Sequence, residues 1–329
     1  MRSLVLCLLF SASASAQDYV VGQMLMTKSG AQITKAGAKI DWKQVSFPLV
    51  VKAVKGDWLD IGPAQIKKSD VVLLEHAIAY YTDYLEQNPT SSWAYNQRAI
   101  VWRQWGQNDK AIEDYTLAIR LNPKSAVAYS NRGNIWSVKR DLDAALKDFS
   151  EAIHLDPKYT KAYFRRGNVL RTKGQFDAAL KDYDEAIRLD PKFAWAFNSR
   201  GAAWKAKGDF DAALKDYEEA VRLDPTYAAA YNSLAWVRAT AKDAMYRNGE
   251  RAVADAIKAC DLTFWRDKYM LDTLAAAYAE AGDFNSAIQW QTKAIELAPE
   301  ASKATYRLRL DLFLSGKPYR EEFKLKQAE

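Results

Sequence analysis

Few residues in this chain have the types and spacing that catalysis requires. There are only two histidines, His76 and His154, and neither has a cysteine or carboxylate partner at metal-ligand spacing. The sequence also has no Gly-rich phosphate loop, nucleophile elbow or zinc motif. Neighbouring carboxylates such as Asp184 and Glu185 are explained by solvation on a helix surface. We therefore expect no catalytic residues, no metal, no cofactor and no enzymatic activity.

A more informative chemical pattern is the separation of charge along the chain. Thirteen basic residues and no Asp or Glu lie in the five fourteen-residue segments that begin at Ser92, Ala126, Thr160, Ala194 and Ala228. Fourteen acidic residues lie in the segments 109–121, 143–155, 177–189 and 211–223. A surface with one sign of charge attracts ligands of the opposite sign. If the basic segments share a surface, its ligands should be anionic.

A regular repeat in the sequence shows which elements hold these segments. The phrases AIRLNP, AIHLDP, AIRLDP and AVRLDP end at one fixed interval, at Pro123, Pro157, Pro191 and Pro225. Within each period, small and aromatic residues recur at helical spacings of three, four and seven. One period contains Tyr129, Gly133, Trp136, Ala145, Phe149 and Ala152. Small residues let two helices approach, aromatic residues fill the space beside them, and each unit needs its neighbour to cover its apolar faces.

This pattern resembles the tetratricopeptide repeat (TPR), a helix-turn-helix unit whose length of about 34 residues matches the interval between the prolines. The resemblance covers residues 70–317 and implies a mainly α fold, a right-handed TPR α-solenoid of about six units. Three glycines stand where a first helix must end and the chain must turn: Gly106, Gly174 and Gly208.

The fifth unit and the C-terminal end depart from the repeat. The interval from Ala235 to Ala252 is longer than the interval from Gly201 to Ala213, which stand at the corresponding positions of the fourth unit. The difference predicts a five-residue bulge between the helices of the fifth unit. We expect a solvated capping helix from Ala301 and a polar tail over residues 318–329.

The resemblance implies that the basic first helices line a concave groove and that the acidic second helices lie outside it. Part of the basic charge has a structural explanation. Arg98, Arg132, Arg166 and Arg200 stand where the family usually has Leu, and we expect them to pair with Asp114, Asp148, Asp182 and Asp216. Nine basic residues of the first helices remain to form the groove.

Some TPR domains grip C-terminal carboxylates with a clamp of Lys, Asn and Arg. By that resemblance, Asn131, Lys161 and Arg165 match the last three clamp positions, whereas Asn96 and Ile100 replace the first two. Arg suits such a role because its planar fork binds both carboxylate oxygens. On the same face we expect Asn134, Asn168 and Arg171.

Two tryptophans of the first helices, Trp195 and Trp236, fall outside the packing positions of the family. Tryptophan is enriched at binding hot spots, so both are candidate peptide anchors. Packing against a neighbouring unit is the alternative explanation for each.

Residues 17–69 differ in character from the repeats. Short β-branched runs are broken by glycine, and a turn at Lys55-Gly56 predicts a hairpin. We expect a small all-β barrel of about five strands. The stretches VVKAVKGDWLDI and AQIKKSDVV resemble a bacterial SH3-like domain, although Ala64-Gln65 stands where that family usually has Gly-Trp. The alternative is a barrel that only caps the open end of the helical array.

The first sixteen residues, MRSLVLCLLFSASASA, have the features of a secretory signal peptide. One Arg precedes an apolar run from Leu4 to Phe10, and the small residues at 14–16 predict cleavage after Ala16. Cleavage leaves Cys260 as the one cysteine, so we expect no internal disulfide. No stretch approaches the roughly 18 apolar residues of a membrane span, so we do not expect an integral membrane protein.

Together, these features predict an exported scaffold, periplasmic or extracellular, that binds another protein in its groove. The expected ligand is an extended or acidic segment, or a carboxylate. In the alternative, the SH3-like barrel binds peptidoglycan or glycan of the cell envelope while the TPR array recruits partners. Nucleic acid is not an expected partner because the protein is exported and has no recognised reading motif.

Overall fold

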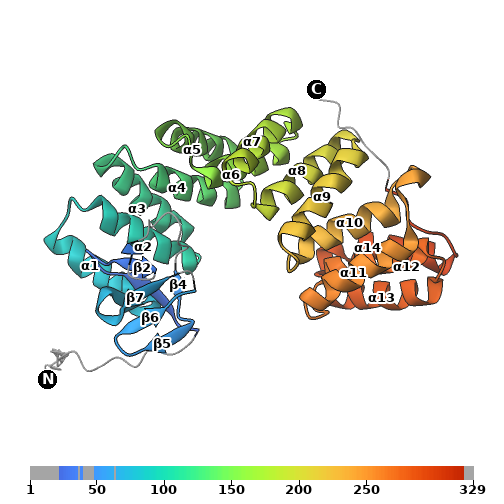
Figure 1. Ribbon diagram of the computed structural model, residues 1–329, viewed down its shortest axis with the longest axis horizontal. Coiled ribbons are helices and arrows are strands. Elements are labelled where there is room, and N and C mark those ends of the chain that lie inside the picture. The colour runs from blue at the N-terminus through green and yellow to red at the C-terminus, as the bar shows by residue number, and fades with distance from the viewer. Residues whose placement is uncertain (1–21, 36–37, 40–47, 63, 322–329) are drawn as a thin grey trace, which may run out of the picture. The chain divides into compact units, whose positions relative to one another are not determined.

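The structure, a computed structural model, describes residues 22–35, 38–39, 48–62 and 64–321 (Figure 1). The predicted signal peptide lies outside the described residues. The chain divides into two compact units, residues 1–135 and 136–329, each of which is described by itself.

The N-terminal part of unit 1 consists of short antiparallel strands in two sheets. One sheet has the order β4-β1-β8 and the other the order β3-β2-β7-β6-β5. The strands are β1 (Met24–Thr27), β2 (Ile33–Lys35), β3 (Ala38–Lys39), β4 (Leu49–Val50), β5 (Ala53–Lys55), β6 (Trp58–Asp60), β7 (Gln65–Lys67) and β8 (Val71–Leu73). The predicted hairpin is present, because β5 pairs with β6 around Gly56, which has a positive φ of 58°. The SH3-like barrel itself stays a prediction.

The helices of unit 1 share a core with this β region. They are α1 (Ala77–Gln87), α2 (Ser92–Gln104), α3 (Asn108–Leu121) and the larger part of α4 (Ala126–Val138), and the 3-10 turns η2 (Lys68–Asp70) and η3 (Leu74–His76) precede them. Met26 of β1 is fully buried in one cluster with Tyr81 and Ala99. The Tyr81 hydroxyl donates a hydrogen bond to the Thr27 carbonyl oxygen at 2.6 Å. The β region therefore covers the apolar side of the first helices.

Unit 2 continues with helices that pack in consecutive pairs (Figure 1). Its helices are α5 (Leu142–Leu155), α6 (Thr160–Thr172), α7 (Phe176–Leu189), α8 (Ala194–Lys207), α9 (Phe210–Leu223), α10 (Ala228–Thr240), α11 (Gly249–Leu262), α12 (Lys268–Glu280), α13 (Phe284–Leu297) and α14 (Glu300–Leu314). The first helix of each pair packs on its second helix, α6 on α7 and α8 on α9, and each second helix packs on the next pair.

Small residues set the distance between paired helices, as the sequence predicts. A Cβ added to Gly167 would lie 2.7 Å from the Tyr183 ring, and one added to Gly201 would lie 2.8 Å from Tyr217. Both tyrosines are almost fully buried. No larger residue fits at these glycines without moving an aromatic ring that is packed in the core.

The bulge predicted for the fifth unit is present. Residues 241–248 separate α10 from α11 and include the 3-10 turn η4 (Ala244–Tyr246). Arg247 holds this loop by donating hydrogen bonds to the carbonyl oxygens of Ala241 and Lys242 and by an ion pair with Glu280 at 3.0 Å.

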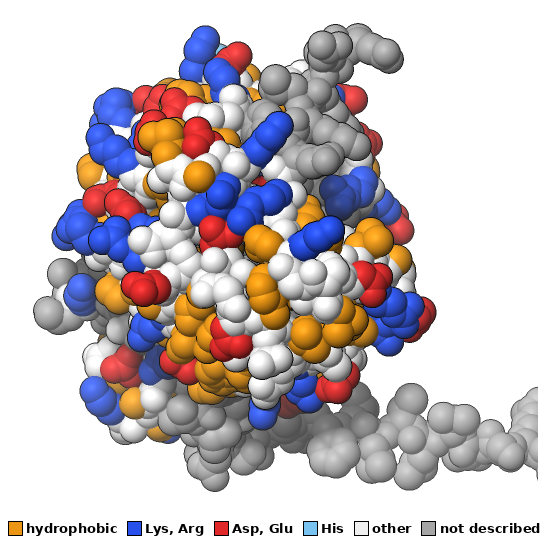
Figure 2. All heavy atoms as spheres, turned by 90° about the vertical axis from the view of Figure 1, so that its right-hand side faces the viewer, with side chains coloured by type: hydrophobic (Ala, Val, Ile, Leu, Met, Phe, Trp, Pro, Cys, Tyr) orange, Lys and Arg blue, Asp and Glu red, His pale blue; other side chains and the backbone are white. Residues whose placement is uncertain are grey.

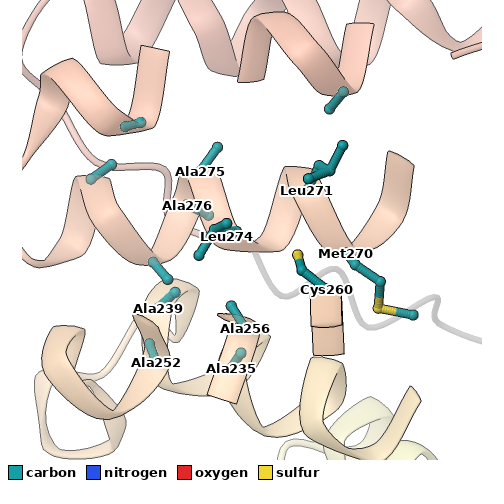
Figure 3. Close-up of a cluster of buried hydrophobic side chains, with 14 of the residues drawn as sticks. Ala235, Ala239, Ala252, Ala256, Cys260, Met270, Leu271, Leu274, Ala275 and Ala276 are labelled. Atoms are coloured by element: carbon teal, nitrogen blue, oxygen red, sulfur yellow. The ribbon is translucent and has the colours of Figure 1, made fainter. Parts of the chain in front are cut away.

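Alanines dominate the core where α10, α11 and α12 meet. Figure 3 shows Ala235, Ala239, Ala252 and Ala256 facing one another, with Cys260 and Met270 beside them. Burial raises the pKa of the Cys260 thiol to about 12. The thiol is therefore neutral at physiological pH and acts as an apolar packing group.

The last helix, α14, lies where a capping helix was predicted, but it is only partly solvated. It buries Tyr306, Arg309 and Phe313 against the last repeat. Figure 2, a space-filling view of the right-hand side of Figure 1, shows hydrophobic side chains gathered on part of this face among charged ones. Exposed large hydrophobic residues in the last helices and the turn before α12 include Phe264, Leu297, Leu308 and Leu314.

Candidate functional site

The predicted Arg–Asp pairs remove several arginines from any binding surface. In unit 2, Arg166 donates through Nε and Nη2 to both carboxylate oxygens of Asp182, at 2.8 and 2.7 Å. Arg200 binds Asp216 with the same geometry and the same two distances. Both aspartates are buried, and these bidentate contacts satisfy their charge within the repeat.

Unit 1 contains a third pair of the same kind. Arg98 donates to both oxygens of Asp114 at 2.8 Å. Three of the four predicted pairs are therefore confirmed. The fourth, Arg132 with Asp148, joins residues of the two units and stays a prediction.

The same arginines also bind the preceding repeat, which the sequence did not suggest. Arg166 donates to the Ser150 hydroxyl at 3.1 Å, and Arg200 forms an ion pair with Asp184 at 2.6 Å. Each partner lies on the second helix of the repeat before its arginine. These arginines thus link consecutive second helices.

In α10, the arginine of this ladder is shifted by one helical turn. Leu234, which is one repeat after Arg200, is buried, and Arg238 binds Glu218 at 2.6 Å and also pairs with Asp255. The sequence carried a signal for this shift, because Leu234 stands at the ladder position and the basic residue Arg238 follows it four positions later.

Two further basic residues pair across consecutive repeats at the ends of their helices. Lys173 binds Asp143 at 2.5 Å, and Lys207 pairs with Asp177. Both lysines are therefore already paired with aspartates and are not counted among the cations that a ligand could contact.

Three further cations of unit 2, Lys161, Arg171 and Lys205, lie at helical positions that share one side of the first helices. We use the term cationic face for Lys161, Asn168 and Arg171 of α6, Trp195, Asn198 and Lys205 of α8, and Asn232 and Trp236 of α10. Along each helix these positions are three, four or seven apart, or sums of these, which puts them on one side. Between helices they recur one or two repeats later, so Arg171 corresponds to Lys205 and Asn168 to Trp236.

Arg171 is held close to the core by the groups beside it. The Tyr183 hydroxyl donates a hydrogen bond to Asn168 Oδ1 at 2.8 Å. Burial raises the pKa of Tyr183 to about 12, and the charge of Arg171 and a hydrogen bond with it oppose this rise. Arg171 Nε is buried and has no hydrogen-bond partner among the described residues. A buried donor without a partner costs free energy that a bound acceptor would recover.

Lys161 is also incompletely compensated. Its side chain is half-buried, and burial together with the positive charge of Arg165 lowers the pKa of Lys161. Within the part of the chain that the structure describes, it has no carboxylate at ion-pair distance. A bound anion would stabilise its charged form.

Lys205 and Trp236 hold a carboxylate in this structure. Lys205 Nζ lies 3.1 Å from both oxygens of Glu321, and the Trp236 indole N–H donates to Glu321 Oε2 at 2.9 Å. Burial raises the pKa of Tyr217, and the charge of Arg171 opposes this rise whereas the charge of Glu321 adds to it. Lys205 and Trp236 therefore converge on one carboxylate, and Arg171 stands at the position that corresponds to Lys205 one repeat earlier.

The two predicted tryptophan anchors behave differently. Trp195 stacks on Tyr227 at a ring distance of 5.8 Å and remains 53% exposed, whereas Trp236 packs on Tyr319 at 5.9 Å. Trp195 thus keeps an exposed ring surface, at the position that corresponds to Lys161 one repeat later. Trp236 is already covered by the chain itself.

Sequence reasoning missed Lys205, Asn198 and Asn232 as members of this face. Lys205 lies one repeat after the predicted Arg171, and that spacing was the available signal, whereas Asn198 and Asn232 correspond only to each other. Asn198 and Asn232 each have a buried Oδ1 without a hydrogen-bond partner in the described residues. Side-chain amides at regular intervals suit the backbone of an extended peptide.

The other predicted groove residues are only partly placed. Asn131 and Asn134 are half-buried on α4 in unit 1, so the clamp that joins Asn131 to Lys161 and Arg165 of unit 2 stays a prediction. In the β region, Ala64 is buried and Gln65 pairs with Asp60 and Thr34 in the sheet, so neither supplies an aromatic ligand groove.

The described residues contain no group of three His, Cys, Asp or Glu that could hold a metal ion. Among the helices of the described residues, none is both long and apolar enough to cross a membrane.

Comparisons with known proteins identify the helical part of the chain. Models described as tetratricopeptide repeat match residues 92–125, 126–159 and 194–227, and residues 270–301. A model described as TPR repeat matches residues 167–208. None of these models indicates a catalytic family. A comparison with curated proteins found no match.

Two solved structures have the same fold as the helical part of the chain, with TM-scores above 0.5. A tetratricopeptide repeat protein from Parabacteroides merdae is 17% identical, with a TM-score of 0.56, over 73% of this chain and 92% of its own. The APC/C hetero-tetramer Cut9–Hcn1 contains a chain that is 14% identical, with a TM-score of 0.64, over 73% of this chain and 46% of its own. MamA is 28% identical over 47% of this chain and 91% of its own, with a TM-score of 0.44.

Proposed function

Because the helical part of this chain is built of tetratricopeptide repeats, we propose that the protein is a non-enzymatic scaffold for another protein. It binds an extended, acidic segment of that partner along the cationic face of α6, α8 and α10.

The state of the cations on the cationic face is the observation that carries this proposal. The ladder arginines are neutralised inside the repeats, whereas Lys161 and Arg171 have no carboxylate partner among the described residues. The third cation, Lys205, holds a carboxylate from the far end of the chain. A protein that needed these cations only for folding would supply their counter-ions from neighbouring repeats, as it does for Arg166 and Arg200.

Elementary electrostatics explains the preference for acidic segments. Cations on a partly buried surface attract carboxylates more strongly than fully solvated cations do, and salt weakens the attraction. Arg171 can bind both oxygens of one carboxylate, and Asn198 and Asn232 can bind peptide groups between the side chains. Trp195 offers an exposed ring for an apolar residue of the same segment.

The proposal includes export of the protein. Residues 1–16 have the composition of a cleaved signal, so the mature chain begins at Gln17 and meets its partner outside the cytoplasm. N-terminal sequencing of the protein isolated from its native cells tests this point, and a chain that keeps Met1 would contradict it.

Binding of a defined acidic peptide tests the function itself. The probe is a fluorescein-labelled peptide of ten alternating Glu and Ala residues, and the measurement is its fluorescence anisotropy with the full chain. We expect the double variant Lys161→Ala/Arg171→Ala to bind at least tenfold more weakly, because each charge-assisted hydrogen bond contributes about 1.5–3 kcal/mol.

The matched control removes the same charge from a second helix. Lys181 and Arg188 are exposed on α7, so Lys181→Ala/Arg188→Ala should keep the affinity of the wild type. Equal weakening by both double variants would mean that only net charge matters. That result, or no binding of the acidic peptide at all, would overturn the proposed site.

A further inference from the structure

The C-terminal segment returns onto the cationic face after the last helix. The chain reverses at Gly316, which has a positive φ of 68°, and runs back along α10. The backbone N–H of Glu321 donates to the Thr240 carbonyl oxygen at 2.9 Å. Residues 319–321 are half-buried in this position.

Side chains of this segment make the contacts that a bound peptide would make. Tyr319 packs on the Trp236 ring at 5.9 Å, and its own ring lies 5.5 Å from the Arg309 guanidinium. Two residues later, Glu321 binds Lys205 and the Trp236 indole. Between them, Arg320 turns the other way and pairs with Glu280 at 2.5 Å.

The alternation fits an extended ligand, in which side chains two residues apart point to the same side. We infer that residues 319–321 are an intramolecular ligand of the cationic face, with which partner segments carrying an aromatic residue two positions before a carboxylate must compete. The inference rests on the proposed function and specifies the ligand pattern of the same site.

The exposure of these contacts separates this role from that of a purely structural strap. The side chains of Lys205 and Glu321 are 24% and 34% exposed, so solvent reaches this ion pair more than it reaches Asp182 of the ladder, whose side chain is 7% exposed. As part of the same chain, however, the segment is present at an effective concentration on the order of millimolar. A partner must therefore supply contacts that the segment lacks, and Arg171, one repeat before Lys205, is available for them.

Competition with a synthetic copy of the segment tests the inference. The probe is a labelled peptide with the sequence of residues 317–322, KPYREE, and the receptors are full-length chains. We expect it to bind the Tyr319→Ala/Glu321→Gln variant at least tenfold more tightly than the wild type. Adding Lys205→Ala to that variant should abolish the gain. The Asp311→Asn variant, which removes an exposed carboxylate of α14, should bind like the wild type.

A check of the fold and a single-residue variant guard against unfolding of the double variant. Circular dichroism checks the fold, and the single variant Glu321→Gln, which keeps the size of the side chain, replaces the double variant if the latter unfolds. Equal affinity of KPYREE for the wild type, for Tyr319→Ala/Glu321→Gln and for Glu321→Gln would overturn the inference. It would also be overturned if the wild type were a dimer that dissociates on Tyr319→Ala/Glu321→Gln, because the segment would then bind a second chain. Binding of the alternating Glu-Ala peptide through Lys161 and Arg171 would still stand in either case, so failure of this inference is distinguishable from failure of the proposed function.

Discussion

At the scale of single residues, one position after the first helix of each of the first four repeats has left-handed backbone. Gly106, Gly174 and Gly208 end their first helices with φ of 72°, 77° and 88°, as the sequence predicted. The corresponding position after α4 is Arg140, with φ of 67°. An L-residue with a side chain pays a steric cost in this conformation that glycine does not pay.

Replacing that residue should stabilise the protein. Because Arg140 is exposed and strained, Arg140→Gly should raise the free energy of unfolding by about 1 kcal/mol. Urea denaturation of the full chain measures the change. Gly174→Arg, at the corresponding position one repeat later, should lower the free energy of unfolding by a similar amount. An unchanged or less stable Arg140→Gly variant would contradict the strain argument.

At the scale of elements, the Arg–Asp ladder joins helices both within and between repeats. Arg166 contacts its own second helix through Asp182 and the preceding one through Ser150. The side chains of Arg166 and Asp182 are only 24% and 7% exposed. Burial makes their separation costly, because each charge depends on the other for compensation.

Removing one partner of this pair should therefore destabilise the solenoid. Asp182→Ala leaves a partly buried guanidinium without its carboxylate, and we expect a loss of about 2–3 kcal/mol in the free energy of unfolding. Restoring an apolar match with Arg166→Leu/Asp182→Ala should recover part of this loss, since Leu234 is buried at the corresponding position of α10.

Thermal or urea unfolding of the wild type and these two variants measures the loss in the free energy of unfolding and the part of it that is recovered. Glu185→Ala on the same helix, which breaks an exposed pair with Arg188, is the control and should leave the stability nearly unchanged. If Asp182→Ala behaved like this control, the ladder would have no structural role.

The regularity of the repeats explains how much could be predicted from the sequence. Helix pairs, their glycine stops and three Arg–Asp pairs follow from spacings that recur from one repeat to the next, and the bulge after α10 follows from one interval that is longer than the others. Two other departures were not predicted: Arg238 takes over the ladder one turn late, and Glu321 reaches Lys205 from the far end of the sequence. A contact made once by a tail has no periodicity to reveal it.

At the scale of the whole molecule, each unit protects one open end of the helical array. In unit 1, Met26 of the β region enters the core of the first helices. In unit 2, α14 buries Phe313 against the last repeat, and its Arg309 binds the buried Asp272 at 2.8 Å. Solenoids need such caps because a terminal repeat has no neighbour to cover its apolar face.

The central claim is that an acidic segment lies on the first helices, and photo-cross-linking locates it most directly. A photoreactive phenylalanine derivative replaces Trp195 in one full-length chain and Arg188 in another, and each chain is irradiated with the labelled peptide of alternating Glu and Ala. Our account predicts a peptide adduct from position 195 that salt suppresses, and none from position 188. Adducts from position 188 alone, or equally from both positions, would contradict it.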